Sequence, residues 1–261
     1  MLDNKKRMVR ENKKKNRRGD VSFFAVVLLG SLFIFFFLGL ASAVPGGPDS
    51  VTVTANETKS VSSPYTLNTS GGYITTINIT STTQNPRWKA FVGQVSGTFT
   101  LDDSSGSTIY DWSMTTVAGE VYATRNSSSI SWTNIKCANT SLLENENTLM
   151  SHTNPDDNIT ATFSDTTHSE FFVASVNISV NSCPTLNTYV GNSSQDTNFE
   201  EVVLSDSTNF SAGGNLIYAT ILEQDATGFD NSTYDFQMIV PENGAEGFSG
   251  ATAYYLYVEL S

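Results

Sequence analysis

Beyond residue 50, apolar and polar side chains alternate along many short stretches of the chain. Val51, Val53 and Ala55 alternate with polar neighbours, and the same spacing recurs over residues 73–80 and 172–180. A period of two is typical of antiparallel strands with one face buried. Further strands are predicted at 88–101, 108–114, 119–124, 159–163, 200–204, 215–222, 234–240 and 251–260. The pattern therefore predicts an all-β fold, either an antiparallel β-sandwich or a jelly-roll.

The segment at residues 87–112, RWKAFVGQVSGTFTLDDSSGSTIYDW, predicts local detail within this pattern. Its apolar positions before Gly93 and after Gln94 have opposite parity, so the alternation slips between them. A β-bulge at Gly93–Gln94 would produce that slip. The polar run DDSSGS then predicts the turn of a hairpin whose two strands flank it.

A different pattern occupies the N-terminal end, where Val21–Val44 form an apolar stretch of 24 residues without a charge. At about 1.5 Å per helical residue this stretch is about 36 Å long, enough to cross a hydrocarbon core of about 30 Å. Residues 1–20 carry nine Lys or Arg against three acids, and such basic flanks stay in the cytoplasm. The sequence predicts a single-pass transmembrane helix in the cell membrane, with the N-terminus inside and the later residues outside.

Three kinds of N-terminal processing are compatible with this segment. The helix could stay uncleaved as an anchor, or a secretory signal could be removed between Ala43 and Val44, after a run of small residues. The motif Arg18–Val21, followed by SFFAVVLLG, resembles the signature at which archaeal prepilin peptidases cut type IV pilins. That resemblance implies cleavage between Gly19 and Asp20, with the apolar helix kept in the mature subunit as part of a filament core.

Composition divides the chain at the apolar segment. A basic cytoplasmic tail at 1–20 and the apolar segment at 21–44 precede a Pro-Gly-Gly-Pro linker at 45–50 and an exterior domain at 51–261. The polar segment at 184–198 marks a point at which that domain could be subdivided. From residue 44 onward, five Lys or Arg stand against 23 Asp or Glu, which leaves a net charge of −18. Such an acidic exterior argues against nucleic acid or anionic lipid as a partner.

Four longer stretches carry a wider resemblance. WKAFVGQVSGTFTLDDSSGSTIYDW, GEVYAT, SISWTNIKC and TGFDNSTYDFQMIVPENG are similar to segments of exported archaeal proteins that have an N-terminal apolar segment and a β-rich ectodomain. The resemblance covers most of residues 50–261. It implies an archaeal cell-surface protein and implies nothing about chemistry.

Ten Asn-X-Ser/Thr sequons after residue 44 predict N-linked glycosylation. They are Asn56, Asn68, Asn78, Asn126, Asn139, Asn158, Asn177, Asn192, Asn209 and Asn231. Asn56, Asn78, Asn158 and Asn177 fall on polar positions of predicted strands. A glycan at any of these four would therefore face solvent.

The two cysteines, Cys137 and Cys183, both lie in the predicted exterior domain. An even pair in an oxidising compartment predicts one disulfide bond, which would close a loop of about 45 residues. Two free buried thiols are the alternative, because sequence separation does not establish that the two residues meet in space.

The sequence lacks the residue patterns of an enzyme. There is no G-x-S-x-G elbow, and His152 and His168 lie in polar stretches that predict exposed side chains. The spacing of His and Cys does not fit zinc, and no glycine-rich phosphate loop is present. Asp225, Asp230 and Asp235 recur every five residues but match no calcium-loop pattern, so we expect them in turns. We expect no catalytic residue, cofactor or metal.

Together these features predict a non-enzymatic, glycosylated protein that is a structural component of the cell envelope. Its expected partners are the membrane, through residues 21–44, and other copies of itself or surface-layer proteins. A pilin-like filament subunit is one alternative. A carbohydrate-binding or adhesion module is another, with aromatic side chains such as those of YYLY at 254–257 as its contact surface.

Overall fold

The computed structural model describes residues 43–126, 130–206 and 216–261. Strands greatly outnumber helical turns in this part of the chain, which confirms the predicted all-β class. No helix within these three ranges is long and apolar enough to span a membrane. The basic tail, the apolar segment up to residue 42, Gly19, Asp20 and Asn209 lie outside the described residues.

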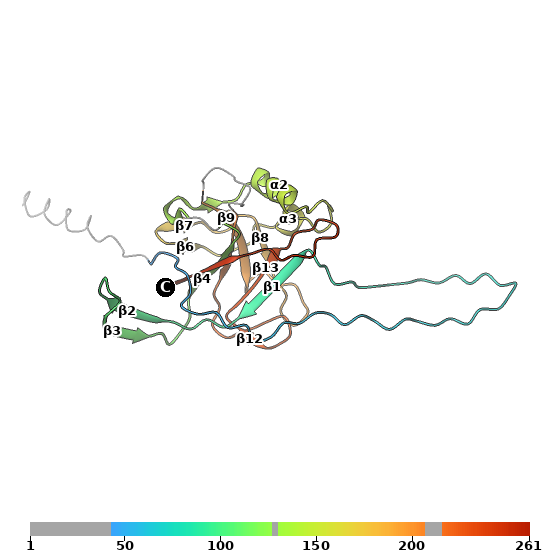
Figure 1. Ribbon diagram of the computed structural model, residues 1–261, viewed down its shortest axis with the longest axis horizontal. Coiled ribbons are helices and arrows are strands. Elements are labelled where there is room, and N and C mark those ends of the chain that lie inside the picture. Colours follow the sequence, from blue (N-terminus) through green and yellow to red (C-terminus); the bar gives the residue numbers. More distant parts are fainter. Residues whose placement is uncertain (1–42, 127–129, 207–215) are drawn as a thin grey trace, which may run out of the picture. The chain divides into compact units, whose positions relative to one another are not determined.

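The centre of the fold is an antiparallel sheet of six strands (Figure 1). Its order is β14 (Tyr255–Leu260), β4 (Gly119–Thr124), β10 (Leu216–Ile221), β9 (Glu200–Ser205) and β5 (Lys136–Cys137), and β8 (Thr185–Asn187) also pairs with β9. Tyr218 of β10 lies opposite Ala123 on β4 and Val203 on β9. All six residues of β4 and all six of β9 are buried, because the sheet is covered on both faces.

One face of this sheet packs against a two-stranded ribbon and two helices. The ribbon consists of β1 (Trp88–Gly93) and β13 (Phe236–Pro241), and the helices are α2 (Thr140–Leu149) and α3 (Ile159–Thr162). Tyr218 and Val203 from the sheet form one apolar cluster with Met238 from the ribbon and Leu143 and Ile159 from the helices. These contacts bury the larger of the two hydrophobic cores.

The opposite face packs against a short hairpin, β6 (Phe171–Val173) and β7 (Val176–Ile178), and a 3₁₀ helix at Trp132–Asn134. Phe171, Val173 and Trp132 pack here against Tyr122 and Ile217 of the sheet. The ring centroids of Tyr122 and Trp132 are 5.2 Å apart. This second core lies beside the disulfide bond, since Cys183 belongs to the same cluster.

Two further strand pairs complete the described secondary structure. β2 (Thr98–Asp102) and β3 (Thr108–Ser113) form the hairpin predicted around DDSSGS, and β11 (Ala226–Thr227) pairs with β12 (Thr233–Tyr234). The predicted bulge at Gly93–Gln94 is wrong, because β1 ends at Gly93 and a new strand starts at Thr98. The change of parity therefore marks the end of a strand.

The predicted strand at 159–163 is also wrong, because this stretch contains α3. The side chain of Asn158 accepts a hydrogen bond from the Ala161 backbone N–H and caps the helix. Asn139 caps α2 in the same way, by accepting from Leu142 N–H. Asparagine is favoured at the N-cap of a helix because its side-chain oxygen accepts a hydrogen bond from an otherwise unpaired helical N–H.

The linker contacts the edge of the main sheet. Gly46 N–H donates to the Val258 carbonyl over 3.0 Å, and Val258 N–H donates back to Gly46 over 2.9 Å. The pairing is limited to this bridge. Pro48 would be the next residue to face β14, and it has no N–H to extend a ladder.

Residues 49–84 form no strand, so the strands predicted from Val51 to Asn56 and over 73–80 are wrong. All 36 residues are exposed, and Figure 1 shows them as a plain blue-to-teal trace without arrows. A turn at Gly71–Gly72 divides the segment into two limbs. Alternation makes a chain competent to form a strand, but a strand also needs a neighbour that completes its hydrogen bonds.

Candidate functional site

The disulfide bond is confirmed, and the alternative of two free thiols is wrong. Cys137 ends β5, and Cys183 precedes β8. Their Sγ atoms are bonded, and their Cα atoms lie 4.8 Å apart at a sequence separation of 46. In the chain-entropy estimate, closing a loop of this length stabilises the fold by about 4 kcal/mol. The bond ties two segments that both pair with β9.

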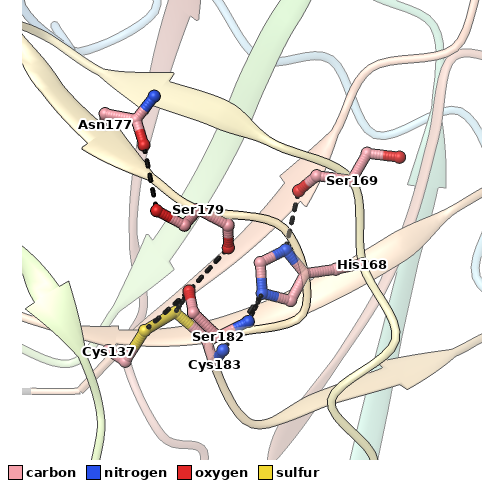
Figure 2. The surroundings of a disulfide bond; sticks show 7 residues. All are labelled: Cys137, His168, Ser169, Asn177, Ser179, Ser182 and Cys183. Atoms are coloured by element: carbon pink, nitrogen blue, oxygen red, sulfur yellow. Dashed lines mark hydrogen bonds between the residues drawn. A yellow bond between two sulfur atoms is a disulfide. The ribbon is translucent and has the colours of Figure 1, made fainter.

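His168 organises the backbone around this disulfide (Figure 2). Its Nε2 accepts hydrogen bonds from the backbone N–H groups of Ser182 and Cys183, each over 3.0 Å. Its Nδ1 lies 2.7 Å from the Ser169 carbonyl oxygen and donates to it. Two donors at Nε2 leave no room for a proton there, which places the ring proton on Nδ1.

The expectation that both histidines are exposed is wrong. His168 and His152 are each buried, with 2% and 1% of their surface accessible. His152 donates from Nε2 to the Glu242 carbonyl over 2.7 Å and meets the Trp88 ring edge-on at 5.3 Å. Both rings thus bond backbone groups within the fold.

The sequons fall into three groups by exposure. Seven of the acceptor asparagines are exposed, namely Asn56, Asn68, Asn78, Asn139, Asn177, Asn192 and Asn231. Asn158 is half-buried, and Asn126 is buried with 9% of its surface accessible. The helix caps at Asn139 and Asn158 use the side-chain oxygen, which leaves Nδ2, the atom that carries a glycan, outside the cap.

The regularly spaced aspartates have structural roles. Asp235 is buried and accepts from the backbone N–H groups of Val95 and Asp225, over 2.8 and 2.9 Å. Asp230 accepts from Ser232 N–H and from the Tyr234 hydroxyl, in the turn before β12. Within the described ranges no three His, Cys, Asp or Glu side chains are grouped closely enough to hold a metal ion.

A buried pair of carboxyl groups was missed by the sequence interpretation. Glu120 on β4 and Glu259 on β14 face each other in register, and the Tyr122 hydroxyl lies 3.4 Å from Glu120 Oε2 and 3.1 Å from Glu259 Oε2. Ala174 N–H donates to both oxygens of Glu259. Burial, reinforced by the Glu259 charge, raises the pKa of Glu120 to about 8. The signal in the sequence was a glutamate within each of two otherwise apolar strands.

A second buried polar pair joins Arg125, the residue after β4, to α2. Arg125 donates from Nε and Nη2 to Glu146 Oε1, over 2.9 and 2.6 Å. Burial raises the pKa of Glu146, and the charge of Arg125 opposes that shift. The pair fixes α2 over the larger core, because Glu146 is almost inaccessible to solvent.

The aromatic residues of YYLY do not form an exposed platform. The Tyr254 hydroxyl donates to the Pro241 carbonyl, and the Tyr257 ring packs on Trp132 at 5.2 Å. The β2–β3 hairpin offers a better aromatic surface, because Phe99 pairs with Trp112 and Leu101 pairs with Tyr110 on one face. All four side chains are exposed. The hairpin was predicted from the sequence, but its exposed apolar face was not.

The geometry contains no grouping of a nucleophile, a base and an orienting acid around either described histidine. The described domain is acidic and contains one internal disulfide bond, several accessible sequons and an exposed aromatic hairpin. No family model matches the chain, and no curated protein or solved structure matches it either.

Proposed function

We propose that the chain is a non-enzymatic glycoprotein of the archaeal cell surface and a structural component of the envelope. The observation that carries the proposal is the combination of a disulfide bond with seven exposed sequons on one acidic domain. Disulfides persist outside the reducing cytoplasm, and N-linked glycans are added to exported chains. Both features are those of an exported protein.

The anchor in this proposal is the apolar segment Val21–Val44, which crosses the cell membrane with residues 1–20 in the cytoplasm. We also infer that the exterior domain is a β-sandwich. Met238 and Val240 of the ribbon pack on Tyr218 of the main sheet, and the β1–β13 ribbon is then the smaller of the two layers.

Protease treatment of intact cells that express the full chain tests this proposal. We expect the exterior domain to be digested while a cytoplasmic marker survives, and glycopeptides to be found by mass spectrometry at Asn56, Asn68 or Asn231. Complete protection in intact cells together with unmodified asparagines would overturn the proposal. Lysed cells, in which the domain must be digested, are the control.

A carbohydrate-binding or adhesion module is the second candidate, favoured by the apolar face of β2–β3. Tyr110 and Trp112 lie on this face with ring centroids 4.8 Å apart, and aromatic rings of this kind stack on sugar rings. Trp112→Ala should abolish retention on a polysaccharide resin if this candidate is correct, while Phe172→Ala, at another exposed aromatic, should not. The pilin-like alternative predicts instead that mechanical shearing releases fibres whose subunits have Asp20 as their first residue.

A further inference from the structure

Residues 49–84, which we call the arm, expose a series of apolar side chains. The nine large ones are Val51, Val53, Val61, Tyr65, Leu67, Tyr73, Ile74, Ile77 and Ile79. Ile74 is fully accessible, and Ile79 is 81% accessible. Single exposed apolar residues are ordinary on a protein surface, but a continuous segment of them marks an interaction site.

The arm has the amino-acid composition of a β-strand. Residues 73–80, YITTINIT, consist almost entirely of β-branched and aromatic residues, which favour strands. No other strand pairs with them in the part of the chain that the structure describes. Their backbone N–H and C=O groups are therefore available to a second polypeptide.

An open strand edge follows the arm directly in the sequence. Among the described strands β1 pairs with β13 alone, and Glu242 N–H donates to the Arg87 carbonyl at the start of this pairing. Hydrogen-bonded pairs alternate along an antiparallel ladder, so the backbone of Ala90 and Val92 faces the edge away from β13. Each copy of the chain thus carries both a strand to donate and an edge to receive one.

The low charge of the arm allows it to approach the acidic domain of a second copy. The arm carries Asp49 and Glu57 against Lys59, a net charge of −1. Residues 85–261 carry four basic residues against 21 acids, a net charge of −17. Two copies repel each other through these acidic surfaces, and a nearly neutral arm can bridge them without adding to the repulsion.

We propose that residues 73–80 of one copy add as a strand to the free edge of β1 in a second copy. Strand addition of this kind obtains its affinity from main-chain hydrogen bonds and its specificity from alternate side chains. Donor and acceptor are different surfaces, so the contact is head-to-tail and each copy can bind two others. The inference rests on the proposed function, since it supplies the contact by which a structural component would assemble.

The sequon at Asn78 is compatible with this contact. Tyr73, Ile77 and Ile79 share one parity of the arm, whereas Asn78 has the other. In a paired strand these two sets point to opposite faces. A glycan on Asn78 would therefore leave the face that carries Ile77 and Ile79 free to be buried.

Sedimentation of the full chain in mild detergent tests the proposal. We expect multimers whose size increases with protein concentration for the natural sequence. Ile77→Lys combined with Ile79→Lys should lower the association constant at least tenfold, since two charges would enter the buried face. Ile109→Lys is the matched control, because Ile109 is 79% accessible and lies outside the arm. All variants keep residues 21–44, so association through that segment is the same in each.

Cysteine cross-linking provides the second measurement, because the folded chain has no free cysteine among its described residues. Copies with Thr76→Cys are mixed with differently tagged copies that carry Ala90→Cys. A mixed disulfide dimer is the expected product, and Ser104→Cys in place of Thr76→Cys should not give it. A monomeric natural chain, an unchanged association constant in the arm variant, or equal cross-linking by the control would each overturn the inference.

Failure of this inference can be told apart from failure of the proposed function. A chain that is digested in intact cells but stays monomeric at every concentration contradicts the arm contact alone. A chain that assembles through the arm but is protected in intact cells contradicts the surface location alone.

Discussion

Glu120 and Glu259 lie directly opposite each other on neighbouring strands, and the hydroxyl of Tyr122 lies within reach of both carboxyl groups. Two carboxylates buried side by side cannot both be charged without a large cost. Burial raises the pKa of Glu120 to about 8 and also raises that of Glu259. The pair therefore keeps a proton in the folded protein at a pH at which both groups are ionised in the unfolded chain.

The stability of the folded domain should decrease as the pH rises from about 5 to 9. The pKa of Glu120 is about 8 when folded and near 4.5 when unfolded, so its contribution is complete below pH 4.5 and is lost as the pH passes through 8. The change of the Glu120 pKa from 4.5 to about 8 corresponds to a loss of roughly 5 kcal/mol. Glu201, whose pKa burial raises well above its ordinary value, changes stability in the same direction.

Glu120→Gln isolates this contribution, because glutamine has nearly the same shape and cannot ionise. Urea unfolding at pH 5, 7 and 9 should give a flatter profile for the variant and a higher midpoint than the natural protein at pH 9. Glu246→Gln, at an exposed position, is the control. Parallel profiles for Glu120→Gln and the natural protein would contradict the proton-sharing pair.

The sequence predicted the interior of the fold better than its periphery. Residues 119–124 were recognised as a strand and are β4, and residues 200–204 were recognised and belong to β9. These strands lie in the centre of the sheet, where local propensity and burial agree. In the arm the same alternation gave a wrong prediction, because none of the described strands completes its hydrogen bonds.

The helices were not predicted from the sequence, because two asparagines belong to sequons and also cap helices. Asn139 and Asn158 belong to sequons, and their role as helix caps was overlooked. The spacing of Leu142, Glu146 and Leu149 after Asn139 is helical, with intervals of four and three residues. Placing Glu146 in the core could not be predicted, because its partner Arg125 follows the end of β4, 21 residues earlier.

His168→Phe should destabilise the domain by about 1–3 kcal/mol, the usual cost of leaving buried backbone N–H groups without an acceptor. Phenylalanine keeps a ring in the site but cannot accept from Ser182 and Cys183. The expected result is a lower urea midpoint with an unchanged m-value. His152→Phe is a useful comparison, because His152 bonds a carbonyl and accepts from no backbone amide of the described residues. Equal midpoints for the natural protein and His168→Phe would show that His168 only fills space.

Replacing both Cys137 and Cys183 by alanine should lower the free energy of unfolding by about 4 kcal/mol. The natural protein, denatured without reductant, should show no thiol that reacts with an alkylating agent. After reduction two thiols per chain should react. Alkylation of two thiols before reduction would contradict the disulfide, whatever the stability of the double variant.

Glycan occupancy should follow the exposure of the acceptor side chains. We expect mass mapping to find Asn126 unmodified in the folded protein, because its side chain is buried and a sugar there would displace core residues. Asn68 and Asn231 are exposed and should be modified. Asn139→Gln should remove a glycan and also cost about 1 kcal/mol through loss of the α2 cap, whereas Asn68→Gln should leave stability unchanged. A fully occupied Asn126 would contradict this dependence on exposure.

The mature N-terminus decides among the three kinds of processing, and each gives a different first residue. An uncleaved anchor begins near residue 1, a pilin-type cut gives Asp20, and removal of a secretory signal gives Val44. All three leave Gly46 in place to pair with Val258, so the fold of the β-rich domain does not depend on the choice. Because Val21–Val44 has the length of a membrane span, we expect the helix to be retained.

Leu32→Arg then places a charge near the middle of the span at a cost of about 2.5–3.5 kcal/mol and should reduce surface display, measured by labelling intact cells. Native protein that begins at Val44 would contradict both the anchor and the filament subunit.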